Sequence, residues 1–363
     1  MSSAAGTNMS NKVQVLFDLF QISHALTPSK NFGCLFNLSC ANLLHEAKTN
    51  PSKFSFCDRT KRLTFKYQIP EITTKILDPE ASNKKLSLSG LTAIVDIFTT
   101  WGLVQHPISQ IQGRRFGVSL QLDTDLYSSG LQEEGLNAGD HIDVEVGVSK
   151  VGRIMGFTTA EIRNSETGQV ICTGRHTKYM PADKITELAL GRFLPLTKIL
   201  SSFLLMPSTL RLSNASKKLT TGSKKEQNMR SLKKEKILVW KDIDANFSQA
   251  TFLVESLHLN EGGKLHGGVS VMLMERIGNQ YLAKNHSKFN WCLKSLNTSY
   301  LSSADISALL YVEVAEFNEV KELSECITTI KIKRKKSEKY VTVTEGILKW
   351  SNLINNAHIV SKY

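Results

Sequence analysis

A short stretch in the second half of the chain combines residue types that could polarise a carbonyl group and hydrolyse the bond beside it. The stretch reads LNEGGKLHGGVSVMLMERIG, and its chemically telling positions are Asn260, His266, Gly267, Gly268 and Glu275. Glycines at a helix start let backbone N–H groups approach a ligand closely, because no Cβ stands in the way. Such donors stabilise a developing oxyanion, and we assign that role to Gly267, with the Asn260 side chain as a second donor. We expect His266 to fix the turn rather than to act as a base.

Glu275 follows the histidine by nine residues, about two and a half turns into the expected helix. Its neighbours Met272, Leu273 and Met274 are apolar, so burial would raise the pKa of the Glu275 carboxyl group. A carboxylate with a raised pKa is suited to general-base catalysis. Direct attack by the carboxylate, giving an anhydride, is the alternative, and the sequence leaves this choice open.

An earlier stretch, LSLSGLTAIVDIF, repeats this pattern in a damaged form. Asp96 again follows the start of the pattern by nine residues. The His-Gly-Gly triplet is replaced by Ser87, Leu88 and Ser89, and Gly90 is a displaced remnant. We therefore expect the first site to be degenerate and Asp96 to be a residual carboxylate.

The elements that must position these residues recur in the same order in both halves. Apolar–polar alternation predicts strands on either side of two apolar helices, 89–104 and 265–283. The strands expected are 53–57 and 62–70, 114–127, 140–164 with an internal turn, 168–180, 236–243, 251–260, 290–304, 308–320, 326–336 and 340–350. A sheet on one apolar helix leaves its other surface uncovered, and a second copy would cover it.

With these motifs, residues 50–180 and 237–351 resemble hotdog-fold acyl-CoA thioesterases of the phenylacetate-pathway and thioesterase-superfamily-member type. The resemblance implies an α+β fold of two tandem hotdog units, each an antiparallel sheet wrapped around a long central helix, forming a pseudo-dimer. The implied organisation is an N-terminal helical extension (1–48), a first unit with a degenerate site (49–183), a connector helix and basic linker (184–236), a second unit with the His-Gly-Gly site (237–351) and a C-terminal tail (352–363).

The resemblance also implies how the sites are composed. Ser119, in FGVSLQLD, matches a serine that helps to position the attacking water in the family, whereas the second half has Leu293 there. If this serine is contributed across the junction, the catalytic residues of the one working site are Glu275, Gly267, Asn260, His266 and Ser119. Gly268 would bind the substrate in that site. The dead site would hold Asp96, Ser89 and Gly90.

A basic strand end is the third feature that the resemblance covers. Arg175 and Lys178, in GRHTKY, match positions that would meet the phosphates of coenzyme A, and a solvated strand end is the alternative. For His176 we expect an ordinary surface or cap role.

These residues predict an enzyme that hydrolyses an acyl-CoA to the free acid and coenzyme A. No metal or redox cofactor is expected, because coenzyme A enters as part of the substrate. Hydrolysis should depend on Glu275 and hardly on Asp96. A non-catalytic hotdog scaffold, attached to a ribonucleoprotein or a mitochondrial assembly, is the alternative, and a dehydratase of the same fold is a third reading. Self-association of the pseudo-dimer is also expected.

The net charge of +12 is confined to two short stretches. Residues 211–236 hold nine basic and two acidic residues, and residues 331–339 hold six basic and one acidic. These surpluses of seven and five account for the whole excess. One interpretation is that these two basic stretches are a solvated linker and a solvated strand end. The other is that they form a contact surface for RNA, for a phosphate-bearing ligand or for a membrane surface.

The cysteines, the longest apolar run and the N-terminal residues indicate the cellular compartment. The six cysteines form no CxxC pair, which favours a reducing, intracellular setting over a disulfide framework or a zinc site. The longest apolar run, 185–206, is broken by charges and by Pro195, so no transmembrane segment is expected. The first 17 residues are Ser-rich and free of acid, which favours the mitochondrion over the cytoplasm, although they contain no arginine.

Overall fold

A computed structural model describes the strands and helices that carry the motifs above. The residues it describes are 31–36, 38, 43, 46, 49–57, 60, 62–75, 85–105, 117–127, 136–180, 237–320 and 325–352. The connector helix and the basic run 211–236 lie outside these residues, as do residues 1–30 of the expected N-terminal helical extension. From residue 31 to residue 48 of that extension, the structure describes the 3-10 helix η1 (Phe32–Phe36), residue 31 and scattered positions after it.

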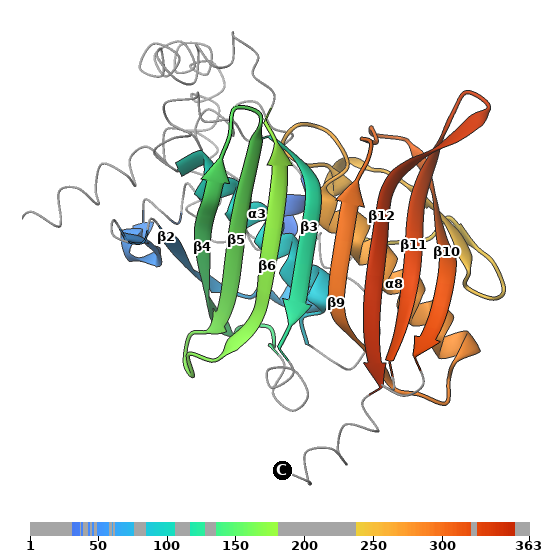
Figure 1. Ribbon diagram of the computed structural model, residues 1–363, viewed down its shortest axis with the longest axis horizontal. Coiled ribbons are helices and arrows are strands. Elements are labelled where there is room, and N and C mark those ends of the chain that lie inside the picture. The colour runs from blue at the N-terminus through green and yellow to red at the C-terminus, as the bar shows by residue number, and fades with distance from the viewer. Residues whose placement is uncertain are drawn as a thin grey trace, which may run out of the picture.

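Twelve strands of the described ranges form one antiparallel sheet. Its order is β1-β2-β4-β5-β6-β3-β9-β12-β11-β10-β8-β7. The strands are β1 (Phe54–Cys57), β2 (Arg62–Gln68), β3 (Val118–Leu126), β4 (His141–Val151), β5 (Met155–Asn164), β6 (Val170–Tyr179), β7 (Asp242–Ile243), β8 (Gln249–Leu253), β9 (Trp291–Tyr300), β10 (Leu309–Val320), β11 (Glu325–Lys336) and β12 (Lys339–Asn352). The first six come from the first half of the chain and the other six from the second half. The halves join where β3 pairs with β9, as Figure 1 shows at the centre of the sheet.

Two long helices pack on one face of this sheet. Figure 1 shows α3 (Leu88–Gln105) behind the strands of the first half and α8 (Gly267–Asn285) behind those of the second half. Nearly every described residue of α3 is buried, because the helix lies between its half-sheet and α8. α8 is amphipathic, and its outer positions, such as Lys284, face solvent. The two helices also pack against each other, where Gly268 meets Ala93 so closely that a methyl group on Gly268 would lie 2.7 Å from the Ala93 Cβ.

The expectation of an α+β fold with an antiparallel sheet on long helices is confirmed. The strands expected over 53–57 and 62–70 form the antiparallel pair β1–β2, and the turn expected inside 140–164 separates β4 from β5. Short 3-10 helices complete the described elements: η2 (Pro51–Lys53), η3 (Glu71–Lys75) and η5 (Ser256–His258).

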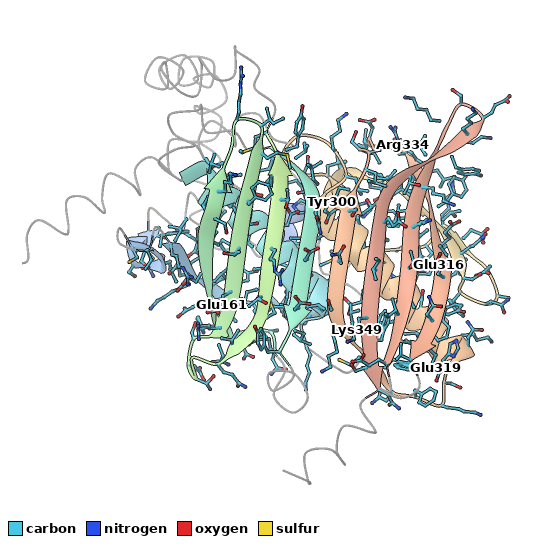
Figure 2. All side chains as sticks on the ribbon, in the orientation of Figure 1. Glu161, Tyr300, Glu316, Glu319, Arg334 and Lys349 are labelled. Atoms are coloured by element: carbon cyan, nitrogen blue, oxygen red, sulfur yellow. The ribbon has the colours of Figure 1, made fainter. Side chains whose placement is uncertain are left out.

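The opposite face of the sheet carries charged side chains. Figure 2 shows Glu161, Glu316 and Lys349 along this face, with Tyr300 and Arg334 toward one end of the strands and Glu319 toward the other. The basic stretch 331–339 forms the β11–β12 hairpin. Within it, Lys331 pairs with Glu345 at 3.4 Å and Lys333 pairs with Glu313, so part of its charge is neutralised on the sheet. Contact of this hairpin with RNA stays a prediction. None of the helices in the described ranges is long and apolar enough to span a membrane.

Candidate active site

The carboxylate that faces the start of α8 belongs to the other helix. Asp96, in the middle of α3, is 5% exposed, and its Oδ2 lies 3.6 Å from Nδ1 of His266. A methyl group on Gly267 would lie 3.0 Å from the same oxygen. The junction therefore brings a carboxylate of the first half to the His-Gly-Gly turn of the second half.

The start of α8 leaves one backbone donor free. His266 is the residue before the helix, and its Nδ1 accepts a hydrogen bond of 2.8 Å from the Gly268 N–H. Burial, together with nearby Lys178, keeps the pKa of His266 below its ordinary value despite the attraction of Asp96, so the ring is neutral and can accept this bond. The Gly267 N–H makes no hydrogen bond to any residue that the structure describes. A free N–H at a helix start is suited to an oxyanion.

A hydrogen-bonded chain of first-half residues orients Asp96. Ser119 donates to Asp96 Oδ1 at 3.1 Å, and His176 Nε2 lies 2.9 Å from the Ser119 Oγ. Thr99 bonds the other ring nitrogen of His176 at 2.7 Å. The neighbouring carboxylate favours the tautomer in which Nε2–H donates to Ser119, leaving the serine proton for Asp96.

A β-bulge turns Ser119 toward Asp96. Ser119 pairs with Lys178 and Gln121 pairs with Thr177, so the residue between them, Leu120, has no partner on β6. Without the bulge, strict alternation from the buried Leu122 would place Ser119 on the opposite face of the sheet. The expected contribution of Ser119 across the junction therefore depends on this one extra residue.

A buried lysine completes the surroundings of Asp96. Lys178 Nζ lies 4.0 Å from Asp96 Oδ1 and donates to the Thr100 hydroxyl at 2.8 Å. Burial alone would raise the pKa of Asp96. The positive charge of Lys178 and the Ser119 hydrogen bond, with the adjacent His266 and His176 rings, outweigh burial and keep the pKa of Asp96 below its ordinary value. Asp96 is thus ionised at neutral pH.

The buried His176 predicts a pH dependence of stability. Burial, followed by the charge of Lys178, lowers the pKa of His176 from 6.5 to about 3. The unfolded chain therefore binds a proton below pH 6.5 that the folded protein does not bind until about pH 3, so stability falls as the pH drops through this window. From pH 7 to pH 5, the unfolding free energy of the wild type should fall by about 2 kcal/mol more than that of His176→Gln. Urea unfolding at both pH values measures this difference, and equal pH dependence in the two proteins would contradict it.

Glu275 belongs to the other end of the helix pair, which corrects the expected grouping with Gly267. The two residues are eight positions apart on one helix, about 12 Å along its axis. Glu275 is 5% exposed, and its Oε2 accepts a 2.9 Å hydrogen bond from the Ser89 N–H at the start of α3. Burial raises the pKa of Glu275, and the bonds from Ser87 and Ser89 offset part of that rise. The two helices thus exchange carboxylates, each facing the start of the other.

The start of α3 has two of its backbone donors bonded to protein groups. The Ser89 N–H is bonded to Glu275, and the Gly90 N–H donates to the Ser87 Oγ at 3.1 Å. Leu88, which corresponds to Gly267, carries a side chain that is 3% exposed. Glutamate is one methylene longer than aspartate, which lets Glu275 reach the N–H of Ser89 at the start of α3. Glu275, and not Asp96 as expected, therefore lies at the start of α3 beside the altered Ser87–Ser89 pattern. Degeneracy of this first site stays a prediction.

Asn260 closes the turn that leads to the His-Gly-Gly triplet. Its Oδ1 accepts from the Gly262 N–H at 2.8 Å and from the Lys264 N–H at 3.1 Å. These bonds use the carbonyl end of the amide, and Nδ2 makes no hydrogen bond to another residue in the described ranges. Its amide remains able to donate.

Three further residues lie elsewhere than the sequence suggests. The Gly268 N–H is already bonded to His266, and its Cα packs on Ala93 and Phe32, so Gly268 serves helix packing rather than substrate contact. Arg175 is exposed on the outer face of the sheet, away from Asp96. Lys178 is buried beside Asp96 instead of reaching phosphates at a strand end.

His176 is the functional candidate that sequence reasoning missed. Positions 174, 176 and 178 are buried while 175 and 179 are exposed, as alternation along β6 requires. Because the central helix lies under this strand, the same alternation in GRHTKY was a signal that His176 and Lys178 share the inner face.

Comparisons with known proteins give distant structural likenesses. No family model matches the chain, and no curated protein matches it. It is similar to an acyl-ACP thioesterase from Bacteroides thetaiotaomicron, with 12% identity and a TM-score of 0.47 over 82% of this chain and 100% of that one. It is similar to a 12:0-ACP thioesterase from Umbellularia californica, with 8% identity and a TM-score of 0.45 over 80% and 98%. It is also similar to zebra fish thioesterase superfamily member 2, with 20% identity and a TM-score of 0.31 over 45% and 96%.

Proposed function

We propose that the chain is an acyl-CoA thioesterase of two tandem hotdog units with one working site at their junction. One observation carries the proposal: the ionised Asp96 of the first half faces the free Gly267 N–H of the second half. A carboxylate opposite an unbonded helix-start N–H can attack a carbonyl group whose oxygen the N–H binds. The symmetry-related place is filled by Glu275 and the Ser89 N–H, which supports a single site.

In the proposed reaction, Asp96 Oδ2 is the reacting oxygen. Oδ1 is held by Ser119, whereas Oδ2 is directed at Gly267. Oδ2 attacks the thioester carbon, the C–S bond breaks, and coenzyme A leaves as a thiolate that takes a proton from solvent. Water then cleaves the mixed anhydride, which releases the acid and restores the carboxylate.

The low pKa of Asp96 favours this route over general-base catalysis. A general base works best when its pKa lies near the operating pH, and a carboxylate held below 3.8 accepts a proton poorly. An ionised carboxylate remains available as a nucleophile throughout the neutral range. Hydroxylamine added during turnover would convert the anhydride to a hydroxamate at Asp96, which mass spectrometry of the peptide detects.

The experiment that tests the function is a thiol-release assay with acyl-CoAs of several chain lengths. The wild type should release free coenzyme A at a rate proportional to enzyme concentration. Failure to release thiol from any acyl-CoA, with folded protein verified by circular dichroism, would leave the non-catalytic scaffold as the better reading.

Ser119→Ala should reduce kcat by about 10- to 100-fold while the protein stays folded. The variant loses the hydrogen bond that holds Oδ1 and leaves the His176 Nε2–H without an acceptor, so Asp96 is less well oriented. Ser165→Ala is the matched control, because it removes a 2.8 Å serine–aspartate bond to Asp143 on the exposed part of the same half. Equal loss of kcat in both variants would show that Ser119 has no special part in the reaction.

A further inference from the structure

The hydroxyl group of Tyr300 lies next to Gly267, the first residue of α8, and has no hydrogen-bond partner among the described residues. Tyr300 ends β9, and Figure 2 shows it beside the junction of the two halves. Its Oη is buried and makes no hydrogen bond to any residue that the structure describes. A methyl group on Gly267 would lie 2.9 Å from this Oη and 3.0 Å from Asp96 Oδ2. The hydroxyl and the carboxylate therefore face the same point above Gly267.

The hydroxyl is a proton donor under all ordinary conditions. Burial, and then the negative charge of Asp96, raise the pKa of Tyr300 well above its ordinary value. A protonated phenol beside a carboxylate can donate one hydrogen bond to a ligand but does not compete with Asp96 as a nucleophile.

The residue that corresponds to Tyr300 by symmetry, at the start of α3, has no hydroxyl group. Asp123 and Asn297 are the central cross-strand partners of β3 and β9. Tyr300 lies three residues after Asn297, and Leu126 lies three residues after Asp123. Leu126 packs on the core and has no hydroxyl. A hydroxyl donor is thus present at the start of α8, where Tyr300 lies, and not at the corresponding Leu126 position.

We propose that Tyr300 is a catalytic residue whose hydroxyl donates a hydrogen bond to the substrate's carbonyl oxygen, together with the Gly267 N–H. This proposal rests on the proposed thioesterase function. As Asp96 attacks, the carbonyl oxygen gains negative charge and both hydrogen bonds strengthen, while the tyrosine proton stays on Tyr300. No described residue satisfies Oη, and a carbonyl oxygen seated above Gly267 would do so.

Tyr300→Phe tests this role in turnover. Removal of one oxyanion donor lowers kcat by about 100- to 1000-fold, and we expect that loss with little change in KM. Tyr67→Phe is the matched control, because it also removes a buried hydroxyl, but one that already donates to the Phe36 carbonyl at 2.6 Å. If Tyr300→Phe keeps wild-type kcat, or loses no more than Tyr67→Phe, the proposal is wrong.

A binding measurement separates this proposal from the activity itself. Two unreactive probes are compared by calorimetry, each with hexyl and dodecyl chains. The first is an acyl-dethia-CoA ketone that keeps the carbonyl, and the second is an S-alkyl-CoA that lacks it. Tyr300→Phe should weaken the ketone about tenfold and leave the S-alkyl-CoA unchanged, because only the ketone accepts the hydrogen bond. Equal effects on both probes, or no binding of the ketone by the wild type, would overturn the role of Tyr300. Failure of the proposed function alone would show instead as ketone binding that depends on Tyr300, without thiol release.

Discussion

Asp96→Asn should lower kcat for acyl-CoA hydrolysis by about a thousandfold or more, although the protein remains folded. The substitution preserves shape and still accepts the Ser119 hydrogen bond, but an amide oxygen is a very poor nucleophile. Loss of the charge also leaves Lys178 buried without its counter-ion. Steady-state thiol release and urea unfolding of the same preparation measure the two effects separately.

Glu275→Gln is the control for this prediction, because it makes the same change at the symmetry-related position. The glutamine oxygen can still accept from the Ser89 N–H, so we expect kcat within about threefold of wild type. Glu275→Ala should lower the free energy of unfolding by about 1–3 kcal/mol, since it leaves that N–H unpaired in the interior. If Glu275→Gln abolished hydrolysis and Asp96→Asn did not, the grouping of Glu275 with Gly267 would be restored.

Gly267→Ala should lower kcat/KM by about 100-fold or more. The added methyl group would fill the point that faces both Asp96 Oδ2 and Tyr300 Oη, at 3.0 and 2.9 Å. A substrate carbonyl could then no longer approach the Gly267 N–H, and the oxyanion would lose this donor. Alanine is a good helix former, and the contacted atoms (Tyr300 Oη and Cζ and Asp96 Oδ2) lie at the ends of their side chains, so stability should change by less than about 1 kcal/mol.

The neighbouring glycine supplies a matched control with the opposite outcome. A methyl group on Gly268 would lie 2.7 Å from both the Ala93 Cβ and the Phe32 ring, within the contact between α3 and α8. Gly268→Ala should therefore cost about 1–3 kcal/mol of stability through overpacking. Thiol release measures the activity of both variants, and urea unfolding measures their stability. Together they distinguish a role in the reaction from a role in packing. A Gly267→Ala protein that is destabilised as much as Gly268→Ala, yet fully active when folded, would show that Gly267 serves packing alone.

The pattern of residues along the sequence was sufficient to predict many of the helices and strands. Alternation and apolar runs predicted most of the strands and both long helices, because burial of one face sets the period along each segment. The strands expected over 236–243 and 251–260 were wrong in extent: β7 covers only Asp242–Ile243, and β8 ends at Leu253 before the 3-10 helix η5. The His-Gly-Gly triplet predicted a helix start, since glycine and a capping side chain suit that position, and α8 begins at Gly267. The damaged triplet at Ser87 to Ser89 likewise predicted a second, altered helix start, and α3 begins at Leu88.

Tertiary structure alone decided which carboxylate meets which helix start. A carboxylate nine residues along a helix cannot fold back on the first turn of the same helix, so Asp96 and Glu275 are exchanged when α3 and α8 pack together. The bulge at Leu120 turns Ser119 inward, and pairing of β3 with β9 places Tyr300 over Gly267. The sequence alone determined the residue types and their elements, because these depend on neighbours in the chain. The composition of the site depends on contacts between segments about 180 residues apart, and no local pattern records them.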